Sequence, residues 1–138
     1  NEGPDARSGC GRRMIFGIGT DIVAVARVRT MWERHGEKML ERILAAQEIA
    51  EFTKAADKGR FLAKRFAAKE AFSKALGTGV RPPATLSAIA VLHDHLGKPM
   101  LGFSPALHAL LEEKNLKAHL SISDEAEYAV AYVILEQA

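Results

Sequence analysis

The chain lacks the features of membrane, disulfide-rich and strongly nucleic-acid-binding proteins. Its 138 residues include a single cysteine, Cys10, which excludes an intrachain disulfide and a cysteine-rich metal site. No apolar run approaches the roughly 20 residues of a membrane-spanning helix. The formal net charge is only +2, so overall charge does not indicate a nucleic-acid partner. These absences predict a soluble protein of the reducing cytoplasm with no membrane partner.

The first thirteen residues differ in character from the rest. The segment NEGPDARSGCGRR has no apolar stretch of the kind that a signal peptide needs, and Met14 directly precedes the first strand-like run. We expect residues 1–13 to be a tag remnant or an N-terminal extension. Residues 14–138 are expected to form one domain, because a chain of this length buries one substantial core but hardly two.

The order of the expected elements favours an α+β fold. They are, in order, a strand at 14–25, helical segments at 28–35, 39–44, 48–52 and 61–76, a hairpin within 86–103, a helix from 105 and a hairpin within 118–136. Segment 54–60 is interpreted as a loop, Gly77 as a helix C-cap, and Ser104 as the N-cap before Pro105. Hairpins pair antiparallel, so we expect a mainly antiparallel sheet packed against helices.

The helix at 61–76 carries an unusual set of charges on a body of alanine, leucine and phenylalanine. Its cations are Lys64, Arg65, Lys69 and Lys74, and its one acid is Glu70. On a helical wheel Arg65 and Lys69 fall within the apolar arc. One interpretation is that these two side chains extend their charged ends to water while Glu70 and Lys74 pair at i,i+4. The other is that this face binds an anionic ligand, with Glu70 reserved for a metal.

A second unusual acid is Asp21, which lies inside the apolar strand segment FGIGTDIVAV. A buried carboxylate needs a partner, a hydrogen bond or a cation. Asp21 could instead cap the following helix or end the strand. If it meets Glu70, the two carboxylates suit Mg²⁺, and Lys74 beside them would neutralise phosphate charge. Sequence separation alone does not show that they meet.

Other motifs are less specific. GIGTD lacks the third glycine of a dinucleotide fingerprint and GTG lacks the residues of a P-loop, so both are interpreted as turn and cap glycines. His119, Ser121 and Ser123 alternate on an expected strand and share one face, with Asp124 following. A hydrolase triad is rejected because no nucleophile-elbow motif is present. The remaining histidines, which have no metal-site spacing, are His35, His93, His95 and His108.

Two long motifs carry a family resemblance. GIGTDIVAVARV at 17–28 and RFLAKRFAAKEAFSKALGTG at 60–79 together resemble the holo-acyl-carrier-protein synthase family, the bacterial 4′-phosphopantetheinyl transferases. The similarity runs from Met14 to the C-terminus. This resemblance implies the fold of that family and transfer of the phosphopantetheine arm of coenzyme A to a serine of acyl carrier protein, releasing adenosine 3′,5′-bisphosphate. It further implies Mg²⁺ and a homotrimer with active sites between subunits.

The resemblance also implies roles for individual residues. By motif position, Asp21 and Glu70 are the expected metal ligands and, with Lys74 on the diphosphate, the expected catalytic set. The other expected contacts to coenzyme A are Arg65, Gly77, His119 and Ser121. Arg27 and Arg34 match the positions that meet the acidic carrier protein. The general base stays open among Glu70, Asp21 and a water on the metal.

Two alternatives remain beside this interpretation. A non-catalytic nucleotide- or RNA-binding module could use the basic helix 61–76, although its phenylalanines are expected in the core rather than displayed for base stacking. A transferase that serves the carrier of a polyketide or peptide synthase is the other.

Overall fold

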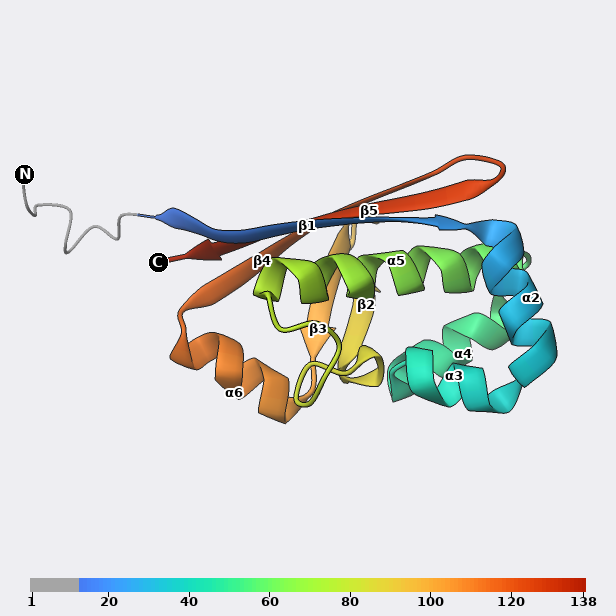
Figure 1. Cartoon of the computed structure of the whole chain (residues 1–138), viewed down its shortest axis with the longest axis horizontal. Helices are drawn as coiled ribbons and strands as arrows, with labels where there is room; N and C mark the ends of the chain where they lie inside the picture. Colours follow the sequence, from blue (N-terminus) through green and yellow to red (C-terminus); the bar gives the residue numbers. More distant parts are fainter. Residues whose placement is uncertain (1–12) are drawn as a thin grey trace, which may run out of the picture.

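The computed structural model describes residues 13–138 as one α+β domain (Figure 1). The elements are β1 (Met14–Ala24), α2 (Val25–His35), α3 (Glu37–Ile43), α4 (Ala46–Lys54), α5 (Lys58–Leu76), the 3-10 turn η1 (Leu86–Ala88), β2 (Ile89–His93), β3 (Pro99–Phe103), α6 (Pro105–Glu113), β4 (Leu116–Asp124) and β5 (Tyr128–Gln137). The expectation about the N-terminal segment lies outside the described residues, except for Arg13.

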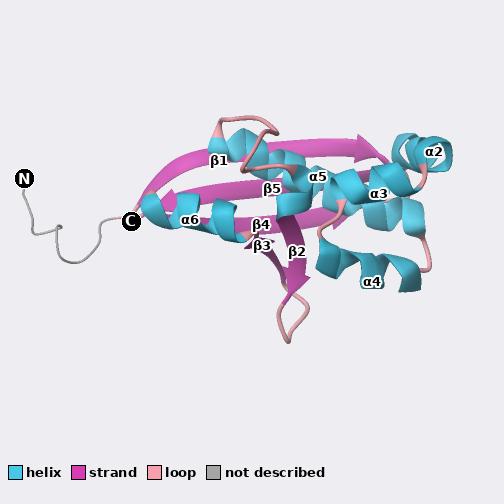
Figure 2. Cartoon of the chain, turned by 90° about the horizontal axis from the view of Figure 1, so that it is seen from below, coloured by secondary structure: helices cyan, strands magenta, loops and turns pink. Residues whose placement is uncertain are grey.

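All strand pairs are antiparallel, as predicted. One sheet has the order β1-β5-β4, and β2 and β3 form a separate two-stranded hairpin. Helix α5 lies along one face of the three-stranded sheet, while α2, α3 and α4 gather at one end of it and α6 at the other (Figures 1 and 2). Within residues 13–138 no helix is long and apolar enough to cross a membrane.

Helix α5 is well defined at both ends. The side chain of Asp57 accepts a hydrogen bond from the backbone N–H of Arg60, and Gly77 ends the helix in the left-handed conformation with φ 90°. The C-cap prediction for Gly77 is therefore confirmed. The loop predicted at 54–60 is wrong at both ends. Lys54 is the last residue of α4, and residues 58–60 belong to α5, because the Asp57 cap starts this helix three residues earlier than the apolar pattern indicated.

The contact between α5 and β1 is unusually close. A Cβ atom built on Gly19 would lie 2.0 Å from the carbonyl oxygen of Ala71, and one on Gly17 would lie 2.0 Å from that of Ala75. Only glycine fits where two backbones approach in this way. The interpretation of GIGTD as turn glycines is therefore wrong, because both glycines lie inside a strand and face the helix.

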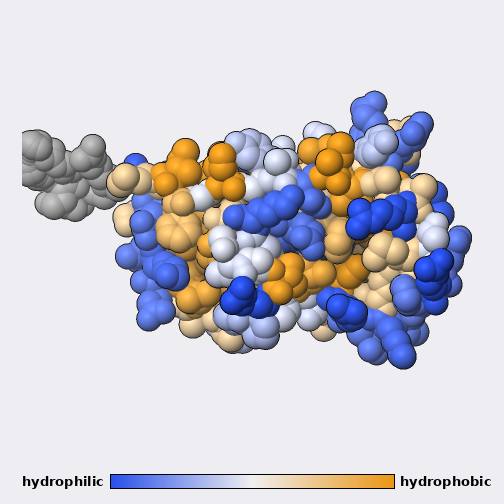
Figure 3. All heavy atoms as spheres, viewed as in Figure 1, coloured by the Kyte–Doolittle hydropathy of each residue, from blue (hydrophilic) through white to orange (hydrophobic). Residues whose placement is uncertain are grey.

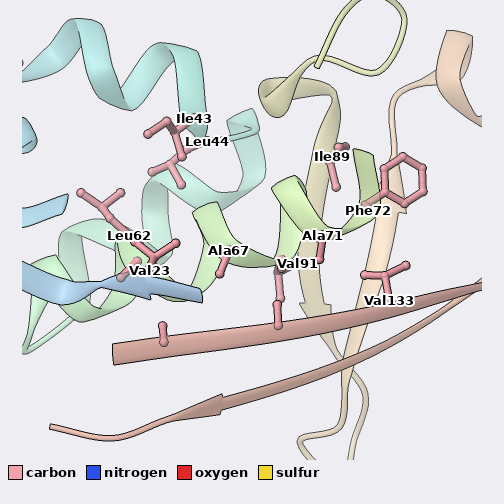
Figure 4. Close-up of a cluster of buried hydrophobic side chains, with 14 of the residues drawn as sticks. Val23, Ile43, Leu44, Leu62, Ala67, Ala71, Phe72, Ile89, Val91 and Val133 are labelled. Atoms are coloured by element: carbon pink, nitrogen blue, oxygen red, sulfur yellow. The ribbon is translucent and has the colours of Figure 1, made fainter. Parts of the chain in front are cut away.

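The core fills the space between α5, the sheet and the surrounding helices (Figure 4). Ala67 and Ala71 of α5 and the neighbouring Phe72 are completely buried. Figure 4 shows them beside Val91 of β2 and Val133 of β5. Burying a large apolar side chain contributes about 1.5–3 kcal/mol, so this packing holds α5 firmly along the sheet.

The predicted N-cap of α6 and the two predicted hairpins are also confirmed. Ser104 caps α6, its hydroxyl oxygen accepting the backbone N–H of Leu107, and the two hairpins turn within 94–98 and 125–127. In α2, Val28 is buried as its helical spacing predicts, and Arg27 and Arg34 are exposed.

Candidate active site

The side chain of Asp21 lies on the face of β1 that packs against α5. Successive side chains of β1 point to opposite faces of the sheet, so Gly19, Asp21 and Val23 share the face that packs on the helix. Asp21 lies opposite Ala131 in the middle of the pairing with β5. The residue that caps α2 is Ala24 and no side chain contributes to that cap. The alternative in which Asp21 is a helix cap or a strand end is therefore wrong.

Lys74 joins the helix to this strand. Its ammonium lies 3.1 Å from Oδ1 of Asp21 and donates a hydrogen bond of 2.9 Å to the backbone carbonyl of Thr20. The ion pair that Lys74 makes is thus across the helix–strand contact with Asp21. It is not the i,i+4 pair with Glu70 that one interpretation of the sequence proposed.

Glu70 lies near Asp21 and Lys74, where its negative charge is unfavourable. Burial of its carboxyl, and then the neighbouring charge of Asp21, raise the pKa of Glu70, while Lys74 and Arg27 act in the opposite direction. Side chains that influence one another in this way are close together. The two carboxylates are therefore near enough to influence each other, although 49 residues separate them in the chain. We call Asp21, Glu70 and Lys74 the open cluster.

The chemistry of this cluster is that of a site for a hard cation and a phosphate. Two carboxylates with one ammonium leave a net negative charge, which a divalent cation would offset. Across residues 13–138 no group of three or more histidine, cysteine or acidic side chains is gathered as a complete metal cage. A pair of carboxylates fits Mg²⁺, an ion that keeps several waters and completes its shell with phosphate oxygens.

Arg65 and Lys69 face away from the open cluster and are buried. The Arg65 guanidinium lies over the Phe61 ring, its Nε is 3.3 Å from Oε2 of Glu48, and it also pairs with Glu51. The Lys69 ammonium donates to Glu48 and to the carbonyl of Ile43. The interpretation that these two side chains extend to water is wrong, because a buried acid receives both. We call Glu48, Arg65 and Lys69 the buried cluster.

Sequence reasoning missed Glu48. The only local signal was its place at the third position of α4, where a glutamate side chain often accepts the N-cap N–H, as it does here from Ala45. The coenzyme A contact predicted for Arg65 stays a prediction.

His119 and Ser121 lie on β4 and face away from α5. Their shared face, predicted from alternation, is confirmed, and Nε2 of His119 is 3.1 Å from Oε1 of Glu136. Asp124, which follows them, forms ion pairs with Arg60 at 3.0 Å and with Lys64 at 3.7 Å. Within one chain His119 and Ser121 therefore lie on the opposite face of the sheet from the open cluster.

The comparisons with known proteins point to one family. The family model described as the 4′-phosphopantetheinyl transferase superfamily matches residues 17–133. A holo-[acyl-carrier-protein] synthase of Dechloromonas aromatica is 77% identical over 125 residues, which cover 91% of this chain and 100% of the relative. The crystal structure of the synthase from Neisseria meningitidis has a TM-score of 0.85 at 45% identity, covering 88% of this chain and 98% of its own. A synthase of Bacillus anthracis in complex with CoA (3′,5′-ADP) has a TM-score of 0.76 at 39% identity, covering 91% and 99%.

Proposed function

The chain belongs to the 4′-phosphopantetheinyl transferase superfamily, and on that premise we propose how its open cluster works. The enzyme transfers the 4′-phosphopantetheine group of coenzyme A to a serine of acyl carrier protein, with adenosine 3′,5′-bisphosphate as the second product. The observation that carries the proposal is the convergence of Asp21, Glu70 and Lys74 where α5 meets β1.

Asp21 and Glu70 would hold Mg²⁺. The fit rests on their donor chemistry and on the raised pKa of Glu70, which burial and then the charge of Asp21 cause; a bound cation would relieve the repulsion between the two acids. When bound, the ion neutralises charge that develops on the diphosphate during transfer. Four further contacts to coenzyme A are proposed: Arg65 on α5, Gly77 at the C-terminal end of that helix, and His119 and Ser121 on β4.

The residues of the open cluster divide the remaining work. The serine hydroxyl attacks the β-phosphorus of coenzyme A, the bond from that phosphorus to the bridging oxygen breaks, and the bisphosphate leaves with that oxygen. Lys74, whose side chain is 54% exposed, binds the diphosphate oxygens as a point charge. Asp21 already accepts a hydrogen bond from Lys74, which leaves Glu70 as the carboxylate of the open cluster that takes the serine proton.

The carrier protein docks on α2 in this proposal. Arg27 and Arg34 are exposed there, and Arg27 is close enough to Glu70 to affect its pKa. A pocket of about 320 Å³ opens beside them, with Met31 and Phe66 among its apolar residues and Lys38 at its rim. Basic groups around an apolar pocket fit an acidic helix that also presents an apolar side chain.

The uncovered face of the three-stranded sheet supports a homotrimer. Within residues 13–138 no helix covers that face, and Ile18, Ile22 and Tyr132 on it are 55%, 62% and 45% exposed. Figure 3 shows hydrophobic residues along the upper margin of the molecule, where Figure 1 places β1. His119 and Ser121 share this face, so assembly would bring them to a neighbouring subunit. A sedimentation mass of three chains is the expected result.

One experiment tests the function against its rivals. The protein is incubated with coenzyme A, Mg²⁺ and purified carrier proteins of fatty-acid, polyketide and peptide synthases. A mass gain of one phosphopantetheine on a single carrier serine is expected, and the fatty-acid carrier should be modified fastest. No mass gain on any carrier, with retention of labelled RNA or nucleotide by the protein, would favour the binding-module alternative.

A further inference from the structure

Glu48 is a completely buried acid that none of the steps above uses. Its side chain is 0% exposed. Oε1 accepts the backbone N–H of Ala45 at 2.8 Å and the ammonium of Lys69. Oε2 accepts the backbone N–H of Val91 at 2.9 Å and lies 3.3 Å from Nε of Arg65. Both oxygens are therefore fully engaged.

These contacts tie the middle of α5 to three other elements. Ala45 precedes α4, Val91 lies in β2, and the Lys69 ammonium also donates to the carbonyl of Ile43 at the end of α3. Hydrogen bonds weaken steeply with misalignment, so contacts from several directions fix the helix about its axis as well as along it.

On the opposite side of α5, the polar contacts with β1 are those of Lys74, whose flexible side chain allows the helix some rotation. There the helix meets β1 through the glycines and alanines of the backbone contact, with Gly19 against Ala71. Small side chains permit close approach, but they interdigitate little. Glu70 directly follows Lys69 in the helix, and one residue corresponds to about 100° of rotation. A modest turn of α5 would therefore move Glu70 away from Asp21.

Stability alone does not account for a buried charged network. Replacing buried ion pairs by apolar side chains of similar volume is often neutral or stabilising. Two cations and an acid at the centre of a domain fit better with a need for one defined orientation.

We propose that Glu48 is a positioning residue for the metal site, fixing through Lys69 and Arg65 the rotation of α5 that sets Glu70 against Asp21. The inference rests on the proposed function, because it concerns the same two carboxylates. Glu48 itself touches neither substrate nor metal in this arrangement.

The test measures metal binding without turnover. Mn²⁺, which carboxylate sites accept in place of Mg²⁺, is titrated by electron paramagnetic resonance with coenzyme A present and carrier protein left out. The main variant is Glu48→Gln/Lys69→Met, which removes the Glu48–Lys69 pair as a unit and leaves Arg65 paired with Glu51. A second variant, Lys69→Gln, keeps a hydrogen-bond donor, but its side chain is shorter and reaches Glu48 less well. The matched control is Glu51→Gln. Glu51 pairs with the same Arg65, but its side chain on α4 is half-exposed.

Both test variants should bind Mn²⁺ about 10–100-fold more weakly, as expected when support of a metal ligand is lost. The control should bind like the wild type. All measurements are made well below each variant's unfolding temperature.

Wild-type Mn²⁺ affinity in either folded test variant would overturn the inference while leaving the proposed function intact. Unfolding of both variants would also overturn it, since Glu48 would then act through stability alone. A wild-type protein that binds no Mn²⁺ would instead count against the metal ligands themselves.

Discussion

The two charged clusters beside α5 contain the same kinds of groups and have opposite properties. In the buried cluster, each oxygen of Glu48 accepts a backbone N–H and faces a cation. In the open cluster, Glu70 is only half-buried, and this burial together with the nearby carboxylate of Asp21 raises its pKa. A carboxylate whose partners all belong to the chain holds the fold together. One that stands beside a second acid retains the capacity to bind something else.

The strongest test of this contrast removes one charge from the open cluster. Glu70→Gln should lower transfer by about 10²–10³-fold or more, because charge on the diphosphate is no longer compensated. The free energy of unfolding should stay equal or rise, since the substitution relieves repulsion by Asp21. Carrier-protein mass spectrometry and urea unfolding measure the two effects. Turnover at the wild-type rate in saturating Mg²⁺ would contradict the ligand assignment.

The corresponding change in the buried cluster should, in contrast, lower the stability of the fold. Glu48→Gln leaves the Lys69 ammonium without its counter-charge in the core, where burial already lowers the pKa of Lys69 to about 8. Breaking a buried pair from one side costs about 3–5 kcal/mol. Urea unfolding should show this loss, with Glu51→Gln as the control. Equal stability losses for the Glu48 and Glu70 substitutions would mean that the two clusters do not differ.

A third substitution sharpens the comparison at the helix–strand contact between the clusters. Gly19→Ala places a Cβ 2.0 Å from the Ala71 carbonyl oxygen, so α5 and β1 must separate at a cost of about 1–3 kcal/mol or more. Gly102→Ala is the control, since the atoms nearest its Cβ belong to the movable side chain of Leu92, with Cδ1 at 2.8 Å and Cγ at 3.4 Å, and the change should alter stability by less than about 1 kcal/mol. Thermal unfolding compares them. Similar midpoints for the two variants would argue against a backbone contact at Gly19.

The smallest expected effect is a shift in pH dependence. Protonated Glu70 can neither bind a cation nor accept a proton, so kcat/KM should fall as the pH drops through its raised pKa. The acid limb should therefore lie above the ordinary range of glutamate. Lys74→Met should move that limb to higher pH, because Lys74 lowers the pKa of Glu70. A limb that stays in place in this variant would exclude Glu70 as the titrating group.

Much of the fold followed from local patterns. The strand at β1, the left-handed cap at Gly77, the N-cap at Ser104 and the two hairpins each rest on a few adjacent residues, and each was predicted. The open cluster needed one further inference, that two acids in apolar surroundings would converge. Strand alternation and the backbone contact of Gly19 explain how they do so.

The buried cluster could not be predicted in this way. The wheel placed Arg65 and Lys69 within the apolar arc, but it gave no sign of the acid that receives them. Two of the groups that fix Glu48 are backbone N–H groups, one of them at Val91, 43 residues along the chain. Backbone donors leave no mark in a sequence, so a long-range contact of this kind becomes visible only in three dimensions.

The alternation of β1 has a consequence for how this segment can change. Its odd-numbered positions from Gly17 to Val23 lie against the helix, and its even-numbered positions, such as Ile18 and Ile22, lie on the uncovered face. Deleting or inserting a single residue before Asp21 would exchange the two sets. An isoleucine would then be forced against the helix, and the carboxylate would move to the opposite surface. The segment can therefore absorb point changes far more readily than any change in its length.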